Sequence, residues 1–159
     1  MVFGDFNGDR IADLISSITT GGLELHTSAG GGQPEYSSTD LEAPAELVQE
    51  IIPVDIDNDS DLDFLISHEV GVSLQFRNVV YLNSGTNPPT FSTMTIANEG
   101  EGLLALFAVD FDHDQDMDIV LAGRNEEVTL LLNDGVVPLS FQSIEVNRPY
   151  TGSAFVTAV

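Results

Sequence analysis

Short apolar runs rich in β-branched and aromatic residues alternate along this chain with acidic stretches and with glycine, proline and asparagine turns. Between residues 47 and 100 this pattern predicts strands at Leu47–Val54, Leu62–Ser67, Val72–Asn83 and Thr90–Ile96. Between residues 101 and 152 it predicts strands at Leu103–Val109, Asp118–Ala122, Val128–Asn133 and Ser140–Val146. Turn sequences at Gly85–Pro89 and Asn133–Gly135 separate strands within these units. Four short strands in a unit of about 50 residues are typical of a β-propeller blade.

Apolar residues also recur at fixed places within the units. Phe91 and Phe141 begin the fourth predicted strands, and Leu82 and Leu132 stand at the ends of the third. An aromatic residue repeated at one offset in a propeller is far more often packed between blades than exposed as a ligand platform. We therefore assign these four residues to the core.

Three nine-residue acidic stretches precede the second predicted strands, at Asp5–Asp13, Asp55–Asp63 and Asp110–Asp118. They start 50 and 55 residues apart, which is a repeat signature. Thirteen of the fifteen aspartates in the chain lie inside them. So many carboxylates in so few residues repel one another unless a cation neutralises them.

The spacing of these residues suits calcium. Oxygen ligands at loop positions 1, 3, 5 and 9, with a main-chain carbonyl at position 7, can surround a cation that takes six to eight oxygens at about 2.3–2.6 Å. We predict about three structural Ca²⁺ ions per chain. The residues expected to hold them are Asp5, Asn7, Asp9, Ile11, Asp13, Asp55, Asp57, Asp59, Asp61, Asp63, Asp110, Asp112, Asp114, Asp116 and Asp118.

An EF-hand is the nearest alternative, because it also places ligands at positions 1, 3, 5 and 7. It requires a bidentate Glu at position 12 and two flanking helices. Position 12 is Ser16, Ile66 and Leu121 in the three loops, and β-prone residues follow each loop. The loops are therefore expected to close at position 9 and to continue directly into a strand.

The charge of the chain excludes one class of partner and disfavours another. The formal net charge is −22, with four arginines and no lysine. Nucleic-acid binding needs a basic patch, so nucleic acid is excluded as a partner. An anionic membrane surface is disfavoured for the same reason.

The chain is expected to fold and to function outside the cell. Its 42% of apolar residues can form a core, and it contains no cysteine for a disulfide or a zinc–thiolate site. No stretch resembles a membrane span, and the start of the chain does not resemble a signal peptide. Millimolar extracellular calcium would saturate loops of the weak class, with a Kd of about 10⁻⁴–10⁻³ M, which favours a secreted protein.

The units resemble the FG-GAP/VCBS repeats of integrin α-subunit heads and of many secreted bacterial and fungal proteins. Val54–Asp63 and Val109–Asp118 look like the VCBS form, and Phe3–Asp9 looks like the FG-GAP form. The resemblance extends over essentially the whole chain. It implies an all-β propeller with calcium in the hairpin between the first and second strands of each blade. The Gly usual at position 6 is replaced by Arg10, Ser60 and Gln115, although a left-handed backbone there costs other residues about 1 kcal/mol.

The units divide the chain into three blades, at residues 1–46, 47–100 and 101–152. The first blade lacks most of its first strand, and Ser153–Val159 resembles the first strand of the third blade. Because known propellers have about four to eight blades, we predict a homodimer that closes a six-bladed ring. In it, residues 153–159 of each copy complete blade one of the other. A segment of a longer propeller is the alternative.

The rim opposite the calcium loops is where we expect a ligand, because ligands of this architecture usually bind there. It would present loop residues able to hydrogen-bond a sugar or a peptide, and an aromatic ring able to stack on a sugar. These candidates are His68, Glu69, Arg124, Asn125, Glu126, Arg148 and Tyr150.

Catalysis has little support in the sequence. The histidines are His26 on a predicted strand, His68 in a predicted turn and His113 in a loop, and no nucleophile motif surrounds them. We expect a lectin-like or adhesion-type binding module without enzymatic activity. Two alternatives stay open: an accessory or catalytic propeller of a secreted polysaccharide-degrading enzyme, and a purely structural unit.

Overall fold

The computed structural model describes residues 1–19, 21–31, 35–41, 46–71, 75–101, 103–123, 128–136 and 138–146. Within these residues every regular element is a β-strand, so the prediction of an all-β chain is confirmed. No helix in this described part is long and apolar enough to cross a membrane.

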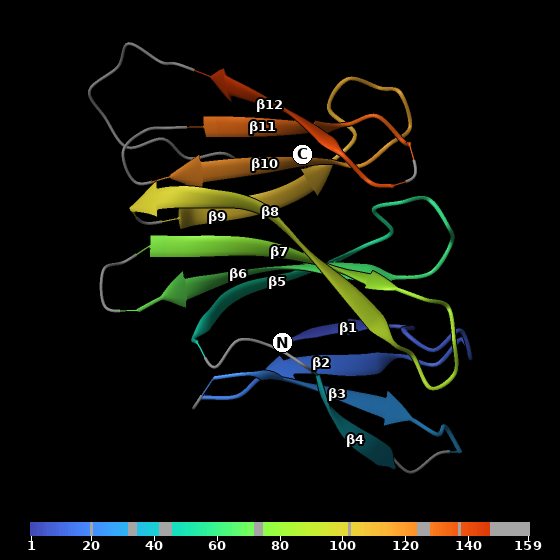
Figure 1. Ribbon diagram of the computed structural model, residues 1–159. Coiled ribbons are helices and arrows are strands. Elements are labelled where there is room, and N and C mark those ends of the chain that lie inside the picture. The colour runs from blue at the N-terminus through green and yellow to red at the C-terminus, as the bar shows by residue number, and fades with distance from the viewer. Residues whose placement is uncertain are drawn as a thin grey trace.

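Twelve strands form three antiparallel sheets of four strands each, stacked one above another in Figure 1. The first sheet contains β1 (Val2–Gly4), β2 (Asp13–Ser17), β3 (Leu23–Ser28) and β4 (Tyr36–Leu41). The second contains β5 (Val48–Val54), β6 (Asp63–Val70), β7 (Gln75–Asn83) and β8 (Phe91–Glu101). The third contains β9 (Leu103–Val109), β10 (Asp118–Gly123), β11 (Val128–Asn133) and β12 (Phe141–Val146). Neighbours in the chain are neighbours in each sheet, as in propeller blades.

The predicted strands agree closely with the observed ones in the second and third sheets. The largest difference is β8, which extends to Glu101 instead of ending at Ile96. β6 is also longer than predicted and extends to Val70 instead of ending at Ser67. His68 and Glu69 therefore lie on a strand, where they pair with Arg77 and Phe76 of β7, and the prediction of a turn at His68 is wrong.

The first sheet has an innermost strand of its own. β1 pairs with β2 over three residues, from Val2 opposite Ile15 to Gly4 opposite Asp13. The corresponding strands β5 and β9 are seven residues long, so β1 is short. Residues 153–159, predicted to complete this blade in another copy, lie outside the described residues, and the exchange stays a prediction.

Two apolar cores lie between the sheets. The first joins β2 and β3 to the second sheet through Ile15, Leu25, Phe64 and Tyr81. The rings of Phe64 and Tyr81 stack with their centroids 4.5 Å apart. The second joins the second sheet to the third through Leu65, Val80, Ile119, Leu121 and Leu131. The predicted core residues Phe91, Phe141 and Leu82 pack against these clusters. Each sheet is thus held by burial of its apolar side chains against a neighbour.

We call the side of a sheet that faces the preceding sheet its front face, and the other side its back face. On the front face of the second sheet lie Phe64, Ile66, Val79 and Tyr81, and on that of the third lie Ile119, Leu121, Thr129 and Leu131. The equivalent residues of the first sheet are Leu14, Ser16, Glu24 and His26, by the pairing of β2 with β3. The front face of the first sheet is therefore more polar than the front faces buried inside the stack.

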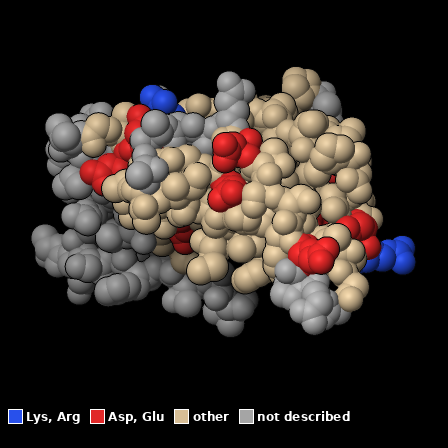
Figure 2. All heavy atoms as spheres, turned by 90° about the horizontal axis from the view of Figure 1, so that it is seen from below, with Lys and Arg blue, Asp and Glu red and all other residues tan. Residues whose placement is uncertain are grey.

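The two ends of the stack differ in character. Figure 2 looks onto the end formed by the first sheet, where acidic side chains are scattered over a mostly uncharged surface. At the other end, the back face of the third sheet exposes Phe111, Ile144 and Val146. Phe111 is 58% exposed, whereas its equivalents Phe6 and Ile56 are 1% and 0% exposed because the following sheet covers them.

Candidate metal centres

The three acidic loops lie where the repeat pattern placed them, between the first and second strands of each sheet. Each ends on an aspartate that is also the first residue of the second strand: Asp13, Asp63 and Asp118. All three are fully buried, unlike most of the loop residues before them. The loops therefore point outward from one end of the sheets, while their last carboxylates reach into the protein.

These last carboxylates hold each loop to the third strand of its sheet. One oxygen accepts the amide of loop position 2, at 3.0, 3.0 and 2.7 Å from Phe6, Ile56 and Phe111. The other accepts the amide at the end of the third strand, at 2.9, 2.7 and 2.8 Å from Ser28, Asn83 and Asn133. A carboxylate has about four lone-pair directions, so each oxygen can still ligate a cation.

Backbone amides also curl the loops around their own carboxylates. The position 1 aspartate accepts the amide of position 6, at 2.7 Å for Asp5, 3.1 Å for Asp55 and 3.2 Å for Asp110. The position 5 aspartate accepts the amide of position 7, at 2.8, 2.9 and 3.0 Å in the three loops. Such bonds from an Asp side chain to the backbone just after it form tight local turns.

The backbone is left-handed at two places in every loop. Position 6 has φ angles of 66° at Arg10, 76° at Ser60 and 82° at Gln115, so the expected left-handed conformation at this position is confirmed. Position 4 has φ angles of 73° at Gly8, 58° at Asn58 and 66° at His113, which the sequence analysis did not anticipate. Five residues other than glycine accept this costly conformation, and strain of this kind is concentrated at functional sites.

Carboxylates from positions 1, 3 and 9 converge in two of the loops. Asp55, Asp57 and Asp63 each offer an oxygen within 4.8 Å of the others, and so do Asp110, Asp112 and Asp118. Among the described residues, buried oxygens of Asp55, Asp57 and Asp110 have no hydrogen-bond partner. Buried acceptors of this kind need a cation or a donor, so both triads fit a hard divalent ion such as Ca²⁺.

The first loop differs at position 3, where Asn7 replaces the aspartate. Its amide oxygen accepts the Asp9 amide at 3.0 Å, and its amide nitrogen lies 3.1 Å from a carboxylate oxygen of Asp9. An amide oxygen can ligate Ca²⁺, but it brings no charge. The first loop therefore offers one negative charge fewer at this position than the other two.

The electrostatics of the loops favour a bound cation. Burial raises the pKa of Asp63 to about 7, with the charges of Asp57 and Asp59 adding to the effect and the amides of Asn83 and Ile56 opposing it. Burial is also the largest cause of the raised pKa values of Asp13 and Asp57. A divalent cation would reverse this balance, because an adjacent positive charge stabilises the ionised form.

The remaining predicted ligands lie outside these triads. The position 5 residues Asp9, Asp59 and Asp114 are exposed. At position 7, the side chains of Asp61 and Asp116 lie against Gly85 and Gly135. Asp116 also accepts a hydrogen bond from the side-chain amide of Asn58, at 2.6 Å. This placement agrees with a carbonyl ligand, rather than a carboxylate ligand, from position 7.

Two asparagines that sequence analysis did not single out join neighbouring loops. The side-chain amide of Asn83 donates to the carbonyls of Phe6 and Leu62, at 2.8 and 3.1 Å. The side-chain amide of Asn133 donates to those of Ile56 and Met117, at 2.8 and 3.3 Å. Each therefore links the loop of its own sheet to the loop before it. The repeated Asn-x-Gly at the ends of the third strands was the signal available in the sequence.

The residues predicted to form a ligand rim are only partly described. His68 is 1% exposed, and its Nδ1 lies 3.1 Å from a carboxylate oxygen of Glu46, so it has no open surface for a ligand. Burial is the main cause that lowers the pKa of His68, and the charge of Glu46 opposes it. Glu69 is partly exposed. Arg124, Asn125, Glu126, Arg148 and Tyr150 lie outside the described residues.

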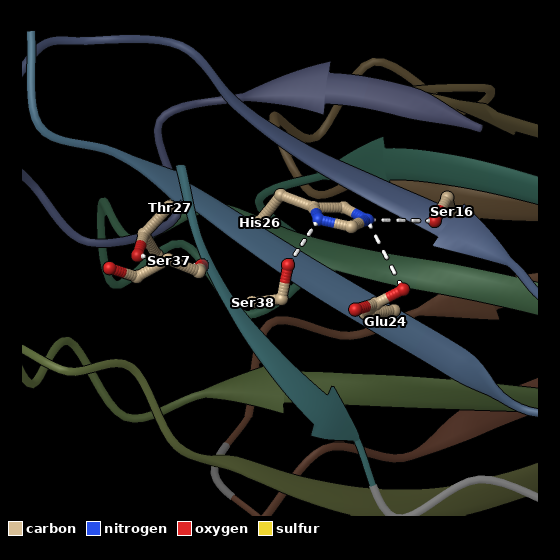
Figure 3. A network of polar contacts seen from close by, with 6 residues as sticks. All are labelled: Ser16, Glu24, His26, Thr27, Ser37 and Ser38. Carbon is tan, nitrogen blue, oxygen red and sulfur yellow. Dashed lines mark hydrogen bonds and ion pairs between the residues drawn. The ribbon is translucent and has the colours of Figure 1, made fainter. Parts of the chain in front are cut away.

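A polar network occupies the front face of the first sheet (Figure 3). His26 on β3 lies between two serines of the neighbouring strands, with Nε2 3.0 Å from the Ser16 hydroxyl and Nδ1 2.8 Å from the Ser38 hydroxyl. Glu24 also approaches Nε2, at 3.6 Å. Because the equivalents of His26 in the other sheets are Tyr81 and Leu131, this network replaces a packed core with hydrogen bonds.

Comparison with known families supports the repeat assignment. Residues 5–66 match the family model of the FG-GAP-like repeat. The FG-GAP-like segment contains the first two acidic loops and ends on β6, and it is consistent with the FG-GAP/VCBS repeat family predicted from the sequence. The third loop lies outside the match but repeats the geometry of the second. No curated protein and no solved structure gave a significant match.

Proposed function

We propose that this chain is a calcium-stabilised binding module of the propeller type, recognising a glycan or a protein. The two aspartate triads with unpaired buried oxygens carry the calcium part of the proposal. The match to the FG-GAP-like repeat supports a propeller-type binding module. The proposed role of calcium is structural, because each loop joins the first and second strands of its sheet and its last carboxylate bonds the end of the third strand.

Thermal unfolding in millimolar CaCl₂ and in a chelator tests the calcium part. An ion that binds only the native state adds about 2.7 kcal/mol at a hundredfold excess over its Kd. For a chain of this size that corresponds to a Tm rise of roughly 5–10 °C per ion. Asp57→Asn and Asp112→Asn should each reduce this rise, whereas the exposed Asp40→Asn outside the loops should not. An unchanged calcium response in both loop variants would refute the ligand assignment.

We also propose binding without catalysis. Of the three histidines, His26 is held by two serine hydroxyls, His68 is buried against Glu46, and His113 is exposed in a loop expected to bind calcium. A glycan array followed by a reducing-sugar assay on each hit separates the alternatives. Binding without sugar release supports the module, and release supports a polysaccharide-degrading enzyme.

Assembly as a homodimer is proposed from the exposed end of the stack. Phe111 is exposed where Phe6 and Ile56 are buried by a following sheet, so a further sheet would cover an equivalent surface. To close the ring, this surface would pack on the front face of the first sheet of the other copy. That face buries less apolar surface than the other front faces, because Ser16 and His26 replace apolar residues there. The mass in calcium buffer distinguishes one chain of 17.1 kDa from two.

We propose an extracellular setting on the basis of the same loops. FG-GAP repeats are typical of extracellular proteins, and loops of modest affinity fill at the millimolar calcium found there. Calcium titration of the melting temperature gives the midpoint directly. A midpoint in the micromolar range or below would remove this argument.

A further inference from the structure

A cleft of about 260 Å³ opens between the outer strands of the first and second sheets. Its walls come from β4, and its floor comes from β7 and β8 and from the turn before β8. The lining residues used below are Thr39, Leu41, Tyr81, Pro89, Phe91 and Thr93. None of the residues that line the cleft belongs to either metal triad.

The cleft has a clear origin in the repeat. Phe91 and Phe141 begin β8 and β12 and pair with Asn83 and Asn133, while Tyr36 begins β4 and pairs with Ser28. By this register Thr39 is equivalent to Met94, and Pro89 is equivalent to Leu139. Met94 and Leu139 pack with Phe141 in the core between the second and third sheets. The smaller side chains of Thr39 and Pro89 leave the equivalent space open between the first and second sheets.

The lining combines an apolar surface with hydroxyl groups. Phe91 provides a partly exposed aromatic ring, whereas Tyr81 borders the cleft but is only 2% exposed, and Leu41 and Pro89 extend the apolar surface. Thr39 and Thr93 bring hydroxyls, which both donate and accept hydrogen bonds, whereas the Thr90 hydroxyl already lies 2.7 Å from that of Ser84. In addition, among the described strands β4 is hydrogen-bonded to β3 alone, so within this part of the chain its other backbone edge can hydrogen-bond a ligand.

The charge around the cleft selects against an acidic ligand. Within the part of the chain that the structure describes, no arginine lines the cleft, and Asp40 stands at its edge. The net charge of −22 repels anions further. A volume near the lower end of the usual range for ligand pockets suits one ring rather than an extended chain.

We propose that this cleft binds one uncharged pyranose ring, such as the terminal unit of a glycan. The apolar C–H face of the sugar lies on the aromatic floor, and its hydroxyls bond the threonines and the free edge of β4. This inference rests on the binding part of the proposed function and names its ligand class and its place. It does not depend on the calcium loops.

Saturation-transfer NMR with the full chain and a panel of methyl pyranosides at millimolar concentration tests the proposal. At least one neutral glycoside should receive saturation, and methyl glucuronoside should not. Thr39→Met should weaken binding at least tenfold, because Met94 fills the equivalent space between the second and third sheets. Ser143→Met, on the exposed outer strand of the third sheet, is the matched control and should bind as the parent does.

Three outcomes overturn the inference. They are no saturation of any neutral glycoside, equal saturation of the glucuronoside, and unchanged binding by Thr39→Met with a parent-like melting temperature. The last outcome moves the sugar site elsewhere and leaves the proposed binding function standing. If the parent and Thr39→Met bound the same glycans on an array equally well, the sugar site would likewise lie elsewhere. A chelator-insensitive melting temperature would instead refute the calcium proposal alone.

Discussion

The side-chain amide of Asn133 lies 2.8 Å from the carbonyl oxygen of Ile56, which is 77 residues earlier in the chain. The same separation of 77 residues and the same 2.8 Å distance relate Asn83 to Phe6. Ile56 and Phe6 both occupy loop position 2, and the following sheet buries both. Each asparagine therefore bonds the backbone of a buried residue of one loop and ties it to the loop of the next sheet.

Replacing Asn133 with leucine should destabilise the protein by about 2–4 kcal/mol. The substitution removes both donors and leaves the carbonyls of Ile56 and Met117 without this partner, at about 1–3 kcal/mol for a buried unpaired group. Urea unfolding in calcium measures the loss. Gln142→Leu on exposed β12 serves as the control and should change stability by less than about 0.5 kcal/mol. A loss below 1 kcal/mol for Asn133→Leu would show that the bridge contributes little.

Replacing Ser60 with glycine should stabilise the protein by several tenths of a kcal/mol, up to about 1 kcal/mol. Ser60 has a φ of 76°, a conformation that glycine adopts without the clash of a Cβ atom. The unfolded chain gains entropy from glycine, so the net gain is smaller than the strain removed. Ser92→Gly, on exposed β8, lacks this benefit and should destabilise. Equal effects of the two substitutions in urea unfolding would contradict the strain argument.

Much of the architecture was predictable because the sequence repeats. The acidic loops recur before each second strand, and the apolar runs after them fall where β6 and β10 begin. The left-handed backbone at position 6 was also predictable, since glycine is the usual residue there. The strand limits were harder to predict. β6 continues through His68, whose imidazole is buried beside Glu46 just before β5, a contact between neighbouring strands of one sheet that local pattern does not reveal.

Acidification should destabilise the protein through His68. Its folded pKa is lowered by burial, so the unfolded chain, with a pKa near 6.5, takes up the proton first. The contribution of neutral His68 to the free energy of unfolding is therefore complete above about pH 6.5. It is lost below that pH, by at most about 1.4 kcal/mol per pH unit. Glu46 and Arg77 are the charged groups that act on the imidazole, in opposite directions.

Urea unfolding between pH 7.5 and 5.5 measures this effect at saturating calcium. His68→Gln should show a shallower loss of stability than the parent, because glutamine does not titrate. His113→Gln, at an exposed loop position, should keep the parent slope. Parallel slopes for all three proteins would show that His68 keeps its ordinary pKa in the folded state.

Substitution of Phe111 tests the predicted homodimer. In a head-to-tail ring, Phe111 of one copy meets the front face of the first sheet of another, where Phe3 is 61% exposed. Phe111→Ser and Phe3→Ser should then both reduce the mass measured by light scattering from two chains to one. A dimer sensitive to Phe111→Ser alone would show that two third sheets meet. A single-chain mass for the parent protein in calcium would exclude the homodimer.

The parts of the site that escaped prediction depend on contacts between distant residues. Asn83 and Asn133 look like ordinary turn residues until the register of three sheets places them beside the preceding loops. The cleft beside Thr39 also depends on residues far apart in the chain. It forms because Thr39 is smaller than Met94, the equivalent residue that fills the space between the second and third sheets. Local spacing identified the aspartates, since all the residues of one triad lie within nine positions of the chain.

The asparagine bridges give the second unit matching partners on both of its sides. A unit such as the second carries the donor, Asn83, for the unit before it and the acceptor, the Ile56 carbonyl, for the unit after it. A tandem duplication of this unit would create a new junction with both partners already in place. Growth of such an array by gene duplication thus needs no compensating mutation at the seam.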